Sequence, residues 1–104
     1  MFMNQNTVLN DWCFAGMFNN CKSLSSVPDL PASSLAMCCY NSMFYKCRGL
    51  STVPSGLLSA AGTLAPFCYN SMFNMCYNLK DAPVLTASTH VNGCYKNMFM
   101  DWRV

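Results

Sequence analysis

Glutamate is absent from this 104-residue sequence, histidine occurs once, and charged residues make up only 10% of the chain. So small a supply of acid–base groups argues against an enzyme that works by proton transfer. His90 is the single histidine, and the sequence suggests no third group that would orient it beside a cysteine nucleophile. We therefore expect His90 to be an ordinary surface residue, and we expect no catalytic residues and no enzymatic activity.

Long hydrophobic runs and basic clusters are also missing. No apolar run reaches the roughly 18 residues of a membrane-spanning helix. The net charge is only +2, and the Lys and Arg residues are scattered. The sequence thus predicts neither a membrane span nor a nucleic-acid-binding surface. The N-terminal stretch MFMNQNTVLNDW lacks the basic start and apolar block of a secretory signal. The protein is then cytosolic, or it has lost its signal, or it is part of a longer product.

What the sequence does contain is a repeated block. CYNSMFYKC at 39–47 returns as CYNSMFNMC at 68–76, with looser copies at 13–21 and 94–102. The first cysteines of successive copies are 26, 29 and 26 residues apart. A near-constant period of this length is typical of a solenoid. We interpret the chain as one array over 1–104, made of a partial leader 1–12, repeats 13–38, 39–67 and 68–93, and a truncated repeat 94–104.

The repeated block has the apolar pattern of a short helix. Tyr40, Met43, Phe44 and Cys47 fall at i, i+3, i+4 and i+7, which is one helical face. The residues between them would point outward. A helix this short is not stable alone in water, so it must pack against the next copy. Equivalent residues are then expected to stack in three columns: Met17, Met43, Met72 and Met98; Phe18, Phe44, Phe73 and Phe99; and Phe14, Tyr40, Tyr69 and Tyr95.

A second block follows each copy and favours extended chain. Its apolar residues lie three apart, and a proline comes next, which forces its predecessor into extended geometry and ends a ladder. We expect very short parallel strands here, on the inside of an arc whose outside carries the helices. The residues concerned are Leu24 and Val27, Leu50 and Val53, and Leu79 and Ala82, followed by Pro28, Pro54 and Pro83.

Together the two blocks form the pattern Cys-Tyr-x-x-Met-Phe-x-x-Cys-x-x-Leu-x-x-x-Pro, as in CYNSMFYKCRGLSTVP at 39–54. This pattern resembles that of the BspA-like bacterial leucine-rich-repeat surface proteins, and it extends over about residues 13–102. The resemblance implies a short right-handed α/β leucine-rich-repeat-like solenoid of about 3.5 units of about 26 residues, with a short helix and a very short parallel strand in each unit. It also implies a cell-surface or extracellular location and a role in adhesion or partner binding.

Eight cysteines raise the question of disulfides and metal sites. Within a copy the cysteines are eight residues apart, about 12 Å along a helix, and neighbouring helices lie about 8 to 10 Å apart. Both distances exceed the roughly 7 Å limit for a disulfide. No closely spaced cysteine pair of the zinc-binding type occurs. We expect no metal and no cofactor, and a buried column of free thiols. Cys38 is expected to be partly exposed and the most reactive thiol.

The candidate binding residues lie on the predicted concave strand face, beside the leucine of each second block. A concave face of this kind presents repeated side chains to a partner, and Arg and Tyr are favoured interface anchors. The residues are Lys22, Arg48, Tyr77, Ser26, Thr52, Lys80 and Asp81. We expect a non-catalytic protein-binding or adhesion module with an unknown protein or glycan partner. The alternatives are that these residues are ordinary solvated side chains, that the chain is a structural fragment stacking end to end into a longer array, or that it is an intracellular thiol or metal-binding protein.

Overall fold

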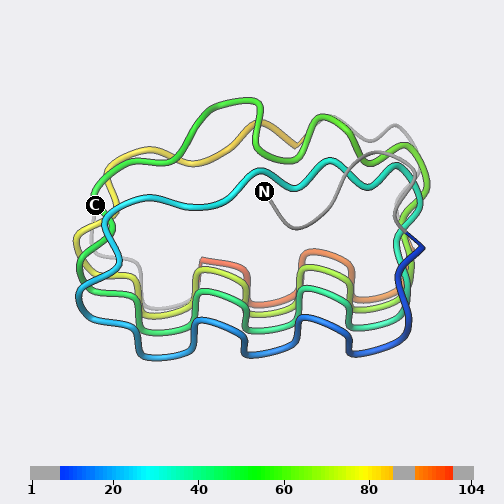
Figure 1. Ribbon diagram of the computed structural model, residues 1–104, viewed down its shortest axis with the longest axis horizontal. Coiled ribbons are helices and arrows are strands. Elements are labelled where there is room, and N and C mark those ends of the chain that lie inside the picture. The colour runs from blue at the N-terminus through cyan, green and yellow to red at the C-terminus, as the bar shows by residue number, and fades with distance from the viewer. Residues whose placement is uncertain (1–7, 86–90, 100–104) are drawn as a thin grey trace.

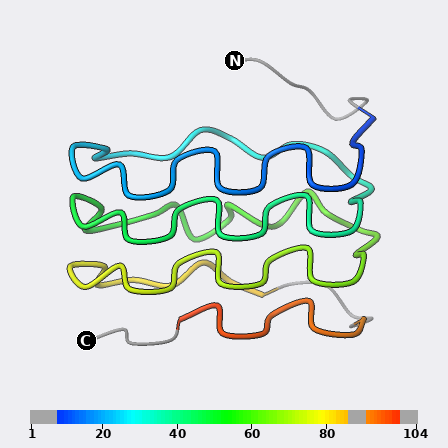
Figure 2. The same cartoon turned by 90° about the horizontal axis from the view of Figure 1, so that it is seen from below.

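The computed structural model describes residues 8–85 and 91–99. Four long runs of consecutive turns, which we call the first to fourth turn ribbons, span residues 11–20, 37–46, 66–75 and 92–99, and a shorter run spans 55–60. Seen from below, the ribbons lie one beneath another as parallel rows in which the backbone steps alternately to one side and the other (Figure 2). Irregular segments join them and form the opposite wall of the molecule (Figure 1).

The predicted α/β leucine-rich-repeat-like solenoid is wrong. The described residues contain no helix, and their only β-pairing is one isolated parallel bridge between Ser34 and Thr63. The helix expected over the repeated block is a turn ribbon. The strands expected after it, at Leu24 to Val27 and at Leu50 to Val53, are irregular chain. A concave strand face is therefore absent from the described part of the molecule.

Each ribbon satisfies its backbone by alternating two kinds of hydrogen bond. In the second ribbon the N–H of Met43 donates to the carbonyl of Tyr40 three residues back (3.1 Å), which closes a turn. The next N–H, that of Phe44, donates to Met72 in the third ribbon (3.0 Å). The same alternation runs through the neighbouring ribbons. Every second residue thus joins one layer to the next, which an α-helix cannot do because its N–H groups bond within the helix.

A left-handed residue recurs at every fourth position of the ribbons. In the second ribbon these residues are Cys38, Ser42 and Lys46, with φ of 56°, 55° and 60°. A positive φ at the third residue of a turn is the mark of a type II turn. Each such residue reverses the local twist, so the chain zigzags instead of coiling. For residues other than Gly and Asn this conformation costs roughly 1–2 kcal/mol. The bonds between layers and the buried side chains must offset that cost.

The shared apolar face was predicted correctly although the helix was not. Tyr40, Met43, Phe44 and Cys47 are all buried. The residues between them are half-buried and point away: Asn41, Ser42, Tyr45 and Lys46. A ribbon with a left-handed residue at every fourth position turns two residues inward and the next two outward. Over one nine-residue block this pattern buries the same positions as an α-helix with 3.6 residues per turn. The spacing of apolar residues therefore could not distinguish a turn ribbon from a helix.

Aromatic columns form the centre of the core and confirm the expected stacking. The rings of Phe18 and Phe44 lie 5.6 Å apart between centroids and within 1° of parallel. Phe44 and Phe73 continue the column at 5.5 Å, and Phe73 and Phe99 at 5.9 Å. A second column runs through the aromatic residue that follows the first cysteine of each block: Phe14, Tyr40, Tyr69 and Tyr95, with centroids 5.6 to 6.1 Å apart.

The opposite wall closes the core with aliphatic side chains. Leu50, Val53 and Leu79 are buried. In the third segment Ala82 is exposed and Pro83 is buried instead. Further buried residues come from the segments between the second block and the next ribbon: Leu30, Ala32, Leu35, Leu57, Leu58, Ala61 and Leu64. The part of the chain that the structure describes holds no helix of the length and apolar character needed to cross a bilayer.

Candidate functional site

The predicted binding residues lie in one region, which we call the corner face and define as residues 22–26, 48–52 and 77–81. These segments follow the first three turn ribbons directly. Figure 2 shows the bends after the ribbons one beneath another at the left end of the layers. The corner face takes the place of the concave strand face on which these residues were expected.

Backbone and side-chain contacts tie neighbouring segments of the corner face together. The side-chain Nδ2 of Asn78 donates to the carbonyl of Arg48 (2.6 Å), and the N–H of Lys80 donates to the carbonyl of Ser51 (2.8 Å). The guanidinium carbon of Arg48 lies 5.3 Å from the centroid of the Tyr77 ring, a cation–π arrangement. The structure therefore brings Arg48, Tyr77 and Lys80 into one neighbourhood.

The remaining predicted residues are accessible but are not joined by any such contact. Lys22 belongs to the same region, because its carbonyl lies against Gly49. Ser26, Thr52 and Asp81 are exposed, as are Lys22, Arg48 and Lys80, while Tyr77 is half-buried. The corner face thus offers three cationic side chains and one carboxylate to solvent, with a ring beneath one of the cations.

The cysteines are free thiols, and most of them lie in the core. Cys39, Cys47, Cys68 and Cys76 are each fully buried. Desolvation raises the pKa of Cys39 to about 12 and that of Cys47 to about 11. It likewise raises the pKa of Cys68 to about 11 and that of Cys76 to about 12. These thiols stay protonated at neutral pH, which disfavours their action as thiolate nucleophiles.

Hydrogen bonds hold one column of thiols in place. The Sγ of Cys47 donates to the carbonyl of Phe18 in the layer before it, and the Sγ of Cys76 donates in the same way to Phe44, both at 3.0 Å. Each cysteine therefore leans toward the preceding layer. The buried thiol column that the sequence predicted is confirmed for the second to fourth ribbons but not for Cys13 and Cys21 of the first copy. The helix spacing that argued against disulfides does not apply, because hydrogen-bonded layers lie closer than packed helices.

The expectation for Cys38 was wrong. Its side chain is buried, with 5% exposure, whereas Cys13 is exposed and Cys21 is half-buried. The sequence could not identify Cys13, because it occupies the same place in its block as the buried Cys39 and Cys68. What differs is its layer: Cys13 belongs to the first ribbon, at one end of the stack. His90 lies outside the described residues, and within 8–85 and 91–99 no three His, Cys or Asp side chains cluster as metal ligands.

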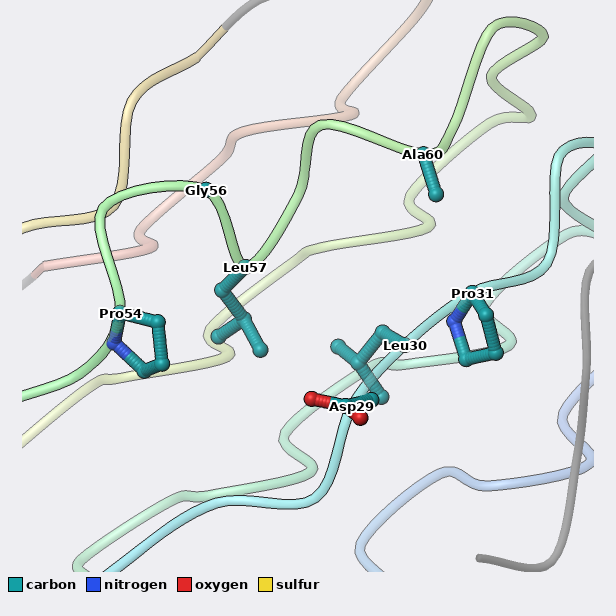
Figure 3. Close-up of a pocket in the computed structure, with 7 residues that line it drawn as sticks. All are labelled: Asp29, Leu30, Pro31, Pro54, Gly56, Leu57 and Ala60. Atoms are coloured by element: carbon teal, nitrogen blue, oxygen red, sulfur yellow. The ribbon is translucent and has the colours of Figure 1, made fainter.

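A shallow pocket on the opposite wall was not foreseen. It has a volume of about 170 Å³ and lies between two irregular segments (Figure 3). This volume is below the roughly 300 Å³ at which ligand-binding pockets usually begin. Asp29 supplies the one charged side chain, and the other lining residues are Leu30, Pro31, Pro54, Gly56, Leu57 and Ala60. The pocket lacks the converging polar groups of a small-molecule site.

Comparison with known proteins gave no match to a family model, to a curated protein or to a solved structure. The resemblance to BspA-like proteins thus stays a prediction from the sequence pattern, as does the cell-surface or extracellular location. The fold that the resemblance implied is not the one that the described residues form.

Proposed function

We propose that this chain is a non-catalytic protein-binding module whose corner face receives an acidic segment of a partner protein. The observation that carries this proposal is the placement of Arg48 over the ring of Tyr77 at 5.3 Å. Asn78 also holds the backbone of Arg48 through its carbonyl. A guanidinium already fixed in place loses less conformational entropy when it binds a carboxylate.

The charge of the corner face supports a partner of opposite sign. Lys22, Arg48 and Lys80 are exposed there, and Asp81 is the one acidic residue among the three segments. Arginine binds carboxylates through two parallel hydrogen bonds, which gives orientation as well as affinity. Neighbouring lysines raise the rate of encounter with an acidic segment and make the binding depend on salt.

The chemistry of the described residues supports a non-catalytic role. The four thiols with raised pKa values are buried in the core. A general base or nucleophile must reach its substrate and needs a pKa close to the working pH. Binding through exposed side chains requires neither a buried group that can reach a substrate nor a pKa close to the working pH.

Binding of a fluorescein-labelled deca-glutamate peptide, followed by fluorescence anisotropy, tests this function. We expect an affinity that falls as salt is added, and a loss of about tenfold in Arg48→Ala, as for an interface anchor. Lys96→Ala is the matched control, because Lys96 is an exposed cation on the fourth ribbon, away from the corner face. Equal losses in the two variants, or no binding at low salt, would overturn the proposal.

A further inference from the structure

The two ends of the stack differ in exposure. In the first ribbon Cys13 is exposed and Met17 is 49% exposed. Their counterparts in the fourth ribbon, Cys94 and Met98, are 4% and 2% exposed. Trp12, also in the first ribbon, is 58% exposed. Among the four ribbons, the first therefore exposes the most apolar side chains to solvent.

The direction in which one column of side chains leans agrees with this difference. Cys47 and Cys76 both reach back to a carbonyl in the preceding layer. Side chains of the fourth ribbon that lean the same way are covered by the third ribbon. Those of the first ribbon lean toward a layer that the described residues do not supply. That face of the first ribbon is therefore not covered by any of the described residues.

The backbone carbonyls of the first ribbon also lack partners among the described residues. In the second ribbon the carbonyls of Met37, Cys39, Asn41, Met43 and Tyr45 each accept an N–H from the first ribbon. The corresponding carbonyls of the first ribbon accept no hydrogen bond from the described residues: those of Asp11, Cys13, Ala15, Met17 and Asn19. A row of carbonyls at regular spacing, without partners among the described residues, resembles the edge of a sheet and pairs readily with a row of donors.

The fourth ribbon carries matching donors. In the third ribbon the N–H groups of Phe67 and Ser71 donate to Asn92 and Lys96 in the fourth ribbon. The equivalent N–H groups of the fourth ribbon belong to Gly93 and Asn97, and these donate to no residue among 8–85 and 91–99. In the described part of the chain, the first ribbon therefore presents acceptors and the fourth ribbon presents donors, in the same register.

We propose that the first turn ribbon binds the fourth turn ribbon of a second copy of this chain. The N–H of Gly93 in one copy donates to the carbonyl of Asp11 in the next, and that of Asn97 donates to Ala15, in the register that joins the layers within one chain. The Phe14 and Phe18 rings of the receiving copy then continue the two aromatic columns of the donating copy. Covering the first ribbon buries the exposed Met17 and Cys13.

This contact is head-to-tail, so each added copy presents a new first ribbon at its far side. Such contacts produce open filaments unless the rotation between copies closes a ring. A face-to-face dimer through two first ribbons would instead oppose carbonyl to carbonyl, which offers no hydrogen bonds. Donor–acceptor matching thus selects the polar arrangement over the symmetric one.

Sedimentation velocity of the full chain under reducing conditions, over a wide concentration range, tests the proposal. We expect the mean mass to rise beyond that of a dimer with concentration, and the thiol of Cys13 to react more slowly with Ellman's reagent as it does so. Met17→Lys places a charge on the open ribbon and should keep the protein monomeric. Met37→Lys is the matched control, because Met37 is 41% exposed but lies in the second ribbon, and it should assemble like the unchanged chain.

Mixing the variants tests the direction of growth. Met17→Lys keeps an intact fourth ribbon, so it should add to the open end of an unchanged filament and stop further growth, which lowers the mean mass. No effect of the mixture on the unchanged chain would contradict the head-to-tail arrangement. A chain that stays monomeric at every concentration, or one in which Met17→Lys and Met37→Lys behave alike, would overturn the proposal altogether.

Discussion

The ring of Phe44 lies between those of Phe18 and Phe73, at 5.6 and 5.5 Å between centroids, and is fully buried. Its contacts therefore join three layers rather than two. We expect Phe44→Ala to lower the free energy of unfolding by about 3–5 kcal/mol, as truncation of a buried phenylalanine does. Urea denaturation with a reducing agent measures the change. Asn41→Ala, at a half-buried outward position of the same ribbon, should cost far less, and equal losses would contradict the placement of the core.

Lys46 offers a test of the turn ribbon against a helix, because its φ is 60°. At a left-handed position glycine is free of the strain that alanine carries. We expect Lys46→Gly to be more stable than Lys46→Ala by about 1 kcal/mol. In a helix the order would be reversed by a similar amount. Both variants lose the same side chain, so the difference between their unfolding free energies isolates the backbone.

Gly49 sits where the second ribbon's bend passes close to the layer before it. A methyl group there would lie 2.9 Å from the carbonyl oxygen of Leu24 and closer still to that of Lys22. Both neighbours are backbone atoms and cannot rotate away, so we expect Gly49→Ala to destabilise the fold by about 1–3 kcal/mol. Gly56→Ala is the control, because its nearest neighbour is the Ser59 side chain at 3.5 Å. Thermal unfolding of the two variants should separate them clearly.

Buried thiols make stability depend on alkaline pH. Burial raises the pKa of Cys76 to about 12, from 9.0 for a free thiol. The unfolded chain therefore loses this proton near pH 9, while the folded chain keeps it. The stabilisation is complete below pH 9 and falls as the pH rises toward 12, because ionisation then favours the unfolded state.

Urea titrations between pH 7 and pH 11, with a reducing agent present, measure this decline. Cys39, Cys47 and Cys68 contribute in the same direction. Cys76→Ala should make the decline shallower, whereas Met72→Leu, a change at a buried group that does not ionise, should leave its slope unaltered. A stability that is flat up to pH 11 would show that these thiols are not held protonated by the fold.

The sequence predicted which residues meet but not the backbone that brings them together. The Phe18, Phe44 and Phe73 column follows from equivalent positions in successive copies, whatever local conformation those copies adopt. The helix was wrong because nine residues are too few to separate a period of 3.6 from one of four. The positive φ of Lys46 and Met75 could not be anticipated either, since neither residue favours that region.

The candidate site was predicted as residues but not as a surface. Arg48 and Tyr77 were expected to be neighbours because they hold equivalent positions after their copies, and the structure places one over the other. Their supposed location on strands was wrong, because residues 48–53 and 77–82 form turns and irregular chain. The exposure of Cys13 depends on which end of the stack lies open, and a local pattern of residues carries no such information.

The alternation of bonds within a turn ribbon also bears on how such a chain can change in length. A layer that accepts on one side and donates on the other, as the second and third ribbons do, can be duplicated between its neighbours without creating a mismatched face. Insertion of a further copy of residues 39–67 would leave both ends of the molecule chemically as they are. A gene with this repeat can therefore gain or lose whole units, because the first and last layers of the protein keep the same chemical groups.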